Sequence, residues 1–379
     1  MKVIHIITGL ATGGAERALY NLLQGGLSTE FDCHVISLSD EGTMGAQIKA
    51  LGVTVITLNM RAGWPTLAGL LKLRSIIKKL QPDLIQGWMY HGNLAATLAR
   101  FFMANKPALI WNVRQSLYDL KHEKRLTRLV IKANRFFSAN PDVLLYNSQL
   151  SRQQHEAFGF SVDKSRVIPN GINLQRFSFS AEARRNILAE LSIPKTAVVI
   201  GHVARLHPMK DHANFLKAAV ILAQRNADIQ FILSGRGVSI NDEALEKHIP
   251  ITLQNRFHLL GERNDVADLM SAMDVFCQSS WTEAFPNVLG EAMAVAIPCV
   301  ATDVGDSALI IGECGVVVPA RDADALIAGI EALLILDTIE RRVLGQQAHN
   351  RIEEQFTLSV IAERYADLYK TASVEKRRT

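Results

Sequence analysis

Short runs of β-branched and other apolar residues alternate with helix-like segments along the chain, and this alternation most restricts the fold. In the first half the runs lie at 3–8, 33–38, 53–58, 83–88, 108–113 and 142–147. Between them lie segments such as AERALYNLLQGG, whose apolar positions recur at helical spacing and which ends on glycines. Strands that alternate with helices form parallel β-α-β units, so this half predicts a doubly wound α/β sheet.

A turn-rich segment separates the two halves of the chain. Pro169, Asn170 and Gly171 in VIPNGINLQRF (167–177) are typical of a turn, and the alternation restarts after them. The second set of strand-like runs lies at 197–204, 229–235, 256–261, 274–280, 298–303 and 315–320. Since 379 residues exceed one compact core, we expect two Rossmann-like domains, 1–172 and 173–357.

The last segment, 358–379, is expected to pack on the first domain. Ile361, Tyr365 and Leu368 repeat at helical spacing and form an apolar stripe that needs a partner. In folds of this kind ligands bind at the carboxyl ends of the strands. The sequence therefore predicts a ligand site in a cleft between two facing domains.

Composition argues against several other classes of protein. Hydrophobic residues make up 48% and charged residues 21% of the chain, as in globular proteins. The four cysteines do not pair at metal-ligand spacing, which argues against a zinc site and a disulfide framework. The apolar run in MKVIHIITGL is short and continues without a cleavage site, so we expect a buried first strand. These features predict a cytoplasmic protein.

Basic residues gather in two amphipathic segments of the first half. They are KLRSIIKK (72–79) and RLTRLVIKANRFF (125–137), in a chain whose net charge is only +4. Two interpretations stay open. The segments are either solvated helix faces or surfaces that adhere to an anionic membrane.

Glycines and cations follow the first strand of each half. Gly13 and Gly14 in TGLATGGAER would let backbone N–H groups approach a phosphate at a helix N-terminus, although a structural turn explains them equally well. Arg205 and Lys210 in ARLHPMKD lie on a strand-to-helix loop that Pro208 keeps from regular structure. Two cations so placed form a clamp for a polyanion, or are simply solvated.

Two carboxylates stand at the edge of an otherwise apolar segment, WTEAFPNVLGEAMAVAIPCVATD (281–303). Pro286 suits the first turn of a helix that reaches to about Ala296, with Glu283 on the approach loop and Glu291 inside the helix. Carboxylates accept hydrogen bonds from sugar hydroxyls, and the helix N-terminus near Phe285 attracts phosphate or sugar oxygens. The plain alternative makes Glu283 a cap and Glu291 an exposed helix residue.

Taken in order, three segments resemble the signature of glycosyltransferase family 4, the retaining enzymes of the two-domain GT-B fold. They are VIPNGINLQRF, HVARLHPMKD and FHLLGERNDVADLMSAMDVFCQSSWTEAFPNVLGEAMAVAIPCVATDVGD. The similarity extends from GGAER near the start to RYADLY near the end. It implies two facing Rossmann-like domains with a cleft between them.

The resemblance also implies roles for the charged residues. Arg205 and Lys210 would hold the donor diphosphate. Glu291 would bind the ribose hydroxyls, and Glu283 would contact the donor sugar. The backbone next to Glu283 would meet sugar and phosphate, at Phe285, Pro286, Asn287, Val288 and Leu289.

Four further positions would border the donor if the resemblance holds. Gly13 and Gly14 would lie beneath the phosphates. Gly235 and the segment around Arg263 would border the nucleobase pocket.

One departure from the family concerns the first domain. Many relatives carry an active-site histidine after the fourth or fifth strand, where this chain has Arg114 in WNVRQS. His91 in MYHGN, with Asn93 beside it, follows the preceding strand. Either His91 or Arg114 would act at the reacting centre or bind the acceptor, and His91 is equally well a packing residue.

The activity that the resemblance implies is retaining transfer of a sugar from a nucleotide diphosphate sugar to a hydroxyl. The Arg–Lys pair would stabilise the leaving diphosphate, so no metal and no cofactor are expected. The aspartates of RDADALI (321–327) are interpreted as helix caps rather than metal ligands.

The sequence leaves alternatives open for the donor, for the acceptor and for the class of reaction. UDP is favoured over GDP, ADP or CMP only because it is common in such enzymes. The acceptor is expected to be a saccharide or lipid-linked saccharide of cell-envelope polysaccharide assembly, met at the inner face of the membrane, with no nucleic-acid partner. A nucleotide-sugar epimerase and a non-catalytic nucleotide-sugar-binding protein are the competing classes.

Overall fold

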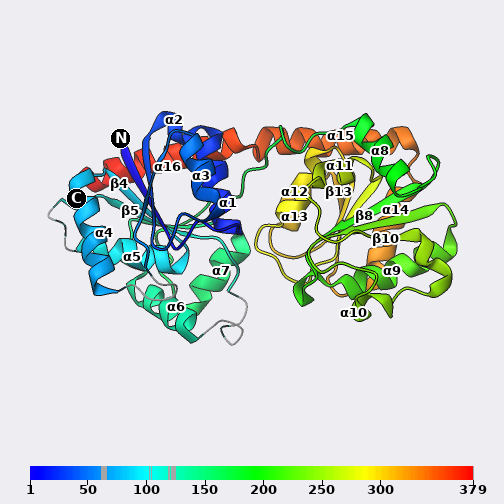
Figure 1. Ribbon diagram of the computed structural model, residues 1–379, viewed down its shortest axis with the longest axis horizontal. Coiled ribbons are helices and arrows are strands. Elements are labelled where there is room, and N and C mark those ends of the chain that lie inside the picture. Colours follow the sequence, from blue (N-terminus) through cyan, green and yellow to red (C-terminus); the bar gives the residue numbers. More distant parts are fainter. Residues whose placement is uncertain (61–65, 102, 104, 118–119, 121–124, 379) are drawn as a thin grey trace. The chain divides into compact units, whose positions relative to one another are not determined.

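The chain forms two compact units, each described here by itself. The computed structural model describes residues 1–60, 66–101, 103, 105–117, 120 and 125–378. The first unit comprises Met1–Gly171 with Leu358–Thr379, and the second comprises Ile172–Thr357. The sequence places the boundary one residue later and assigns the same C-terminal segment to the first unit. In each unit a parallel sheet has helices on both faces (Figure 1).

The sheet of the first unit has seven parallel strands in the order β3-β2-β1-β4-β5-β6-β7. The strands are β1 (Lys2–Ile7), β2 (Asp32–Ser37), β3 (Thr54–Thr57), β4 (Leu84–Trp88), β5 (Ala108–Val113), β6 (Val143–Tyr146) and β7 (Ser165–Val167). The six strands predicted here are confirmed. β7 was missed because its three residues contain an exposed arginine and form no apolar run.

Helices cover both faces of this sheet and supply its two apolar cores. One face is covered by α1 (Gly14–Leu22), η1 (Leu23–Leu27), α3 (Gly42–Ala50) and α16 (Leu358–Arg378). The other is covered by α4 (Leu67–Leu80), α5 (Met89–Phe101) and α6 (Arg125–Phe137). The described residues of this unit also form α2 (Ser28–Glu30) and α7 (Gln149–Phe158).

The second unit repeats the plan with six parallel strands in the order β10-β9-β8-β11-β12-β13. They are β8 (Val198–Val203), β9 (Ile229–Ser234), β10 (Phe257–Leu259), β11 (Val275–Gln278), β12 (Cys299–Thr302) and β13 (Gly315–Val318). All six were predicted. Buried parallel strands have continuous apolar sequences because both of their faces are covered, which is why the sequence reveals them.

The helices of the second unit divide between the two faces in the same way. One face is covered by α8 (Ala181–Glu190), α11 (Val266–Ser271), α12 (Asn287–Ala294), α13 (Ser307–Ile311) and α15 (Thr338–Gln355). The other is covered by α9 (His212–Arg225), α10 (Glu243–Glu246), η4 (Ile251–Arg256) and α14 (Ala323–Ile335). Asp322 caps α14 by accepting from the Ala325 amide at 2.9 Å, which confirms the capping interpretation for Asp322, whereas Asp324 lies in the first turn of the helix.

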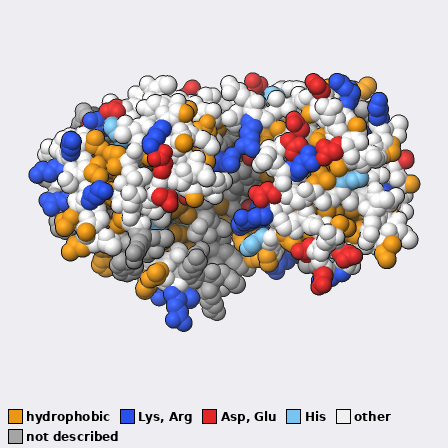
Figure 2. Space-filling model, in the orientation of Figure 1, with side chains coloured by type: hydrophobic (Ala, Val, Ile, Leu, Met, Phe, Trp, Pro, Cys, Tyr) orange, Lys and Arg blue, Asp and Glu red, His pale blue; other side chains and the backbone are white. Residues whose placement is uncertain are grey.

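Helix α6 has apolar side chains on its solvent side as well as its buried side. Val130 and Ile131 face the core, whereas Leu129 is 55% and Phe136 80% exposed. Lysine and arginine side chains lie at the surface over this helix (Figure 2). In the described part of the chain no helix is long and apolar enough to cross a membrane.

The C-terminal helix α16 is fastened to the first unit by packing and by polar contacts. Ile361, Tyr365 and Tyr369 are buried in the core that α16 shares with α1 and η1. The Tyr365 hydroxyl accepts a hydrogen bond from Asn112 Nδ2 at 3.0 Å, and the Tyr369 hydroxyl donates to Gln86 Oε1. The helix therefore completes a core rather than lying on a finished surface.

Truncation after Leu358 should destabilise the first unit. Each large buried side chain contributes about 1.5–3 kcal/mol, so loss of Ile361, Tyr365 and Tyr369 approaches the whole stability of a domain. Thermal unfolding followed by circular dichroism tests this, with a chain ending at Ser373 as the control. An unchanged melting profile together with unchanged activity would contradict the assignment.

Candidate active site

In each sheet the strand that comes first in sequence lies between two other strands. The candidate residues lie on the segments that follow these central strands and one neighbour of each. β1 lies between β2 and β4, and β8 lies between β9 and β11. Loops that follow such neighbouring strands diverge to opposite faces, which leaves a crevice at the carboxyl edge of the sheet. Gly13, His91, Lys210 and Glu283 lie on the segments that follow β1, β4, β8 and β11 respectively.

The loop after β8 is short and shaped by a single helical turn. β8 ends at Val203 and α9 begins at His212, with the 3₁₀ turn η3 (Pro208–Lys210) between them. Pro208 starts this turn, so the expectation that it keeps the loop irregular is wrong. A proline fits the first position of a helical turn because its missing N–H needs no partner there.

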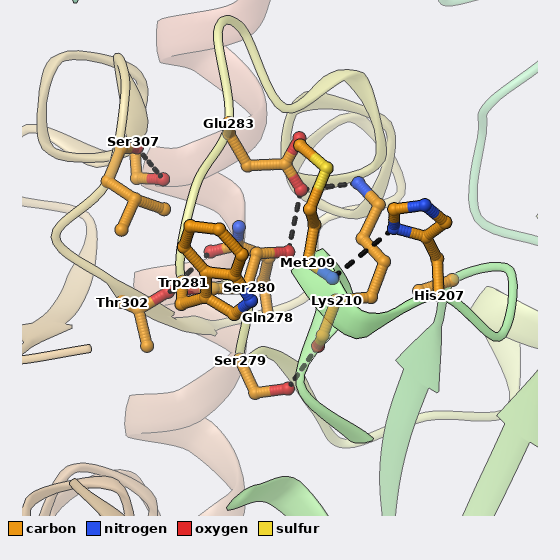
Figure 3. A network of polar contacts seen from close by, with 12 residues as sticks. His207, Met209, Lys210, Gln278, Ser279, Ser280, Trp281, Glu283, Thr302 and Ser307 are labelled. Carbon is orange, nitrogen blue, oxygen red and sulfur yellow. Dashed lines mark hydrogen bonds and ion pairs between the residues drawn. The ribbon is translucent and has the colours of Figure 1, made fainter. Parts of the chain in front are cut away.

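Lys210 and Glu283, predicted to bind different parts of a donor, are bound to each other. Lys210 Nζ forms an ion pair with Glu283 Oε1, and Ser280 Oγ donates to the same oxygen at 2.6 Å (Figure 3). The side chains of Lys210 and Glu283 are 23% and 12% exposed. The capping interpretation of Glu283 is wrong, since α12 has no side-chain cap.

Hydrogen bonds to backbone carbonyls join the two loops that carry this ion pair. Ser279 Oγ donates to the Lys210 carbonyl at 3.0 Å. The Trp281 amide donates to the Met209 carbonyl at 3.0 Å, and its indole Nε1 donates to the Pro208 carbonyl at 2.9 Å. The positions of the ammonium and the carboxylate are therefore fixed from both sides.

Arg205 differs from Lys210 in having its charge uncommitted. Its side chain is exposed, and within the described residues it makes no hydrogen bond or ion pair. Gly235, expected to border a nucleobase pocket, lies against the backbone of this loop. A Cβ at Gly235 would collide with the Ala204 carbonyl, and its φ of 151° is one that other residues rarely adopt.

The segment after Glu283 presents backbone, not side chains, at the start of α12. Phe285, Pro286 and Leu289 are buried in the domain core, Val288 is half-buried and Asn287 is exposed. Pro286 occupies the cap position and supplies no side-chain hydrogen bond to the helix. The first amides of α12 therefore lack a side-chain cap, and such amides attract anions.

The other two predicted donor residues of this unit differ in environment. Glu291 is half-buried on the fifth residue of α12. Arg263 is bound to two carboxylates, with Asp265 at 2.6 Å and Glu190 at 2.7 Å. The hydrogen bonds that Arg263 donates to Asp265 and then to Glu190 raise the pKa of Arg263. The guanidinium thus ties the loop after β10 to α8.

In the first unit the paired glycines form the start of α1. Gly13 is the cap residue and Gly14 the first helical residue. A Cβ on Gly14 would meet no atom within 4 Å, whereas one on Gly13 would collide with the Glu16 carboxylate. Burial raises the pKa of Glu16. The glycines therefore leave one side of this helix end open and let Glu16 fold over the other.

His91 and Asn93 both lie at the start of α5 but have different surroundings. Burial lowers the pKa of His91, so its imidazole is neutral at pH 7, and within the described residues it makes no hydrogen bond. Asn93 is fully buried, and its Oδ1 accepts from the Asn112 amide at 3.2 Å. Asn93 therefore holds α5 against β5, which leaves His91 as the available group.

Arg114 is held in place by three side chains from separate parts of the first unit. Its guanidinium donates to the Tyr365 hydroxyl at 2.8 Å and to Asn170 Oδ1, and lies 5.4 Å from the centre of the Trp88 ring. Asn170 was identified only as a turn residue and Tyr365 only as an apolar contact. Ser280, which binds Glu283, was not identified at all.

No cluster of three or more His, Cys, Asp or Glu side chains suited to a metal ion occurs in the described ranges. The cationic and amide groups gathered after β8 and β11 suit an anionic ligand instead. Arg205 and Lys210 supply full charges, and the start of α12 supplies N–H groups.

Two doubly wound sheets with anion-binding groups at their strand ends define the GT-B fold. HepE of Anabaena, solved in complex with UDP, has this fold. Its TM-score to this chain is 0.81 and its sequence identity 22%, covering 98% of this chain and 100% of that one.

Sequence comparison identifies the family. The model described as Glycosyltransferase Family 4 matches residues 12–176, and that described as Glycosyl transferases group 1 matches residues 197–335. The chain therefore belongs to glycosyltransferase family 4, as its motifs predict.

Two curated relatives illustrate the range of the similarity. UDP-Gal:alpha-D-GlcNAc-diphosphoundecaprenol alpha-1,3-galactosyltransferase of Escherichia coli is 26% identical over 320 residues, which are 81% of this chain and 80% of the relative. The capsular polysaccharide biosynthesis glycosyltransferase CapM of Staphylococcus aureus is 23% identical over 382 residues, covering 98% and 97%.

We expect substitutions of Glu283 and Glu291 to have opposite effects on the binding of a nucleoside diphosphate. In Glu283→Gln the Lys210 ammonium loses its competing partner, so we expect UDP to bind severalfold more tightly while turnover falls. If Glu291 binds the ribose hydroxyls, as the resemblance implies, Glu291→Gln should weaken UDP binding about ten- to a hundredfold, because a charge-assisted hydrogen bond contributes about 1.5–3 kcal/mol. Isothermal titration calorimetry with UDP measures both dissociation constants.

Glu354→Gln, at an exposed position of α15 in the same unit, is the matched control and should change neither constant. Equal weakening by the Glu283 and Glu291 variants would refute the separate roles while leaving the family unaffected.

Proposed function

We propose that the protein is a retaining, metal-independent glycosyltransferase that moves a sugar from a UDP-sugar to a hydroxyl of a lipid-linked saccharide. The observation that carries this is the arrangement of Lys210, Glu283 and Ser280, with Arg205 uncommitted on the same loop. An ammonium already paired with a carboxylate can exchange that partner for a phosphate at little electrostatic cost.

The leaving diphosphate gains negative charge as the bond to the sugar breaks. Arg205 and Lys210 would stabilise that charge in the transition state, which is the role a metal ion has in other transferases. Because hydrogen bonds join the two loops, the backbone that carries Lys210 and Glu283 needs little reorganisation during the reaction. The backbone amides at the start of α12 would add donors to the same phosphates.

Retention requires the acceptor to attack from the side that the diphosphate leaves. In the proposed step the acceptor oxygen forms the new bond to the anomeric carbon, and the bond from that carbon to the diphosphate oxygen breaks. The acceptor proton passes to the departing phosphate. Glu283 is a poor candidate for the base, because Lys210 and Ser280 already occupy one of its oxygens.

UDP and a lipid-linked acceptor are favoured by the relatives. The Escherichia coli relative is named for UDP-Gal and a diphosphoundecaprenol saccharide, and HepE is solved with UDP. We assign the same classes of donor and acceptor to this chain, with Arg114 and His91 on the acceptor side. Arg114 would bind an acceptor oxygen from a fixed position.

A panel of nucleotides tests the donor. At about 100 times its dissociation constant the correct ligand should stabilise the protein by about 2.7 kcal/mol in a thermal-shift measurement, and we expect UDP to exceed GDP, ADP and CMP. The anomeric configuration of the product, read by proton NMR, tests retention. Conversion of a nucleotide sugar without any acceptor would instead indicate an epimerase.

We further propose that α6 rests on an anionic membrane, where a lipid-linked acceptor is presented. The helix offers exposed Leu129 and Phe136 beside the exposed cations Arg125, Lys132 and Arg135. Apolar side chains in the headgroup region and cations over anionic lipid act together, and each cation near the surface contributes about 1 kcal/mol.

Liposome sedimentation tests this surface. Wild type should prefer anionic over neutral vesicles, and high salt should weaken binding. Replacing Arg125, Lys132 and Arg135 by Gln should reduce binding, whereas Arg185→Gln with Lys195→Gln in the other unit should not. No preference for anionic vesicles would mean that α6 is an ordinary solvated helix.

A further inference from the structure

A second basic pocket lies in the second unit, beside the loop between β8 and α9. It has a volume of about 580 Å³, and Lys217, Trp281, Arg321 and Asn214 are among the residues that line it. Lys210 and Glu283 are not. In Figure 3 the Trp281 ring is turned away from the Lys210 ammonium.

Arg321 stands in this pocket at a conformational cost. Its φ is 62°, in the left-handed region that is costly for a residue with a side chain. The guanidinium lies 4.5 Å from the centre of the Trp281 ring, which fixes its direction. Backbone strain at a residue with a fixed, charged side chain points to a use for that side chain.

The pocket has hydrogen-bond donors that the described residues leave without acceptors. Lys217 and Arg321 are exposed and make no hydrogen bond or ion pair within the described ranges. Asn214 Nδ2 is buried and has no partner there. The Asp211 carboxylate also lines the pocket. It caps α9 by accepting a hydrogen bond from the backbone N–H of Asn214 at 3.3 Å.

The cations of Lys217 and Arg321 and the side-chain amide of Asn214 would suit a ligand that has negative charge and several strong hydrogen-bond acceptors. A phosphate monoester has both, and guanidinium binds phosphate bidentately while lysine binds it as a point charge. The volume leaves room for a sugar-sized group beside the phosphate. We propose that this pocket is a second anion site, which binds a phosphate monoester separately from the donor clamp at Arg205 and Lys210.

Binding of ribose 5-phosphate tests the site without requiring turnover, so the result is independent of the proposed reaction. Titration at constant ionic strength, followed by thermal shift and calorimetry, should give saturable binding to the wild type. Arg321→Gly and Lys217→Gln should each raise the dissociation constant about tenfold or more. Glycine accepts a positive φ, so Arg321→Gly should stay folded, as circular dichroism will verify.

Two variants separate this pocket from other causes. Lys210→Gln should leave ribose 5-phosphate binding unchanged, and Arg185→Ala on α8, which removes one charge on the other face of the sheet, should do the same. Loss of binding in Lys210→Gln would assign the phosphate to the donor clamp. Equal loss in Arg185→Ala, or an equal shift from sodium chloride alone, would mean general charge attraction and overturn the site.

A final comparison identifies the source of the phosphate. Phosphatidic acid vesicles carry the same monoester on a lipid, whereas ribose 5-phosphate carries it in solution. With Arg125, Lys132 and Arg135 of α6 replaced by Gln in every sample, loss of vesicle binding on adding Arg321→Gly but not Lys210→Gln would assign the site to a headgroup. Loss of ribose 5-phosphate binding alone would assign it to a soluble ligand. Absence of binding to both probes would overturn the proposal.

Discussion

Parallel pairing of β8 with β9 on one side and β11 on the other is the constraint on which the candidate site depends. It brings the carboxyl ends of strands distant in sequence to one edge of a sheet. Arg205 and Lys210 reach that edge from the loop after β8, and Glu283 from the loop after β11. The hydrogen bonds of Ser279 and Trp281 then join the loops, so the site inherits its geometry from the sheet.

The strands could be predicted from the sequence because both of their faces are buried, which gives continuous apolar runs. β5 (Ala108–Val113) has the bounds that its apolar run predicts, and the other predicted runs differ from their strands by a few residues at either end. β7 could not be found, since Arg166 breaks its three residues at the sheet edge. Pro208 was misread because proline both interrupts helices and starts them, and only the backbone distinguishes the two.

The sequence proposes the residues of the candidate site but does not give the contacts between them. Sequence spacing cannot reveal that Lys210 pairs with Glu283, since the two are 73 positions apart. The same holds for Tyr365, whose hydroxyl binds Arg114 across 251 positions. For Gly235 the sequence predicts a place at the nucleobase pocket, but it does not reveal that a side chain there would collide with the Ala204 carbonyl.

The Lys210–Glu283 ion pair largely cancels the charge at the centre of the loop that follows β8. A carboxylate attached to the protein acts at a local concentration that dissolved chloride or inorganic phosphate does not reach. An anion that offers only its charge therefore gains little by displacing Glu283. A ligand that also binds elsewhere in the protein can offset that loss with its other contacts. If Lys210 binds a phosphate as proposed, Glu283 would pair with Lys210 again once the ligand has left, and the ion pair would discriminate against small ions.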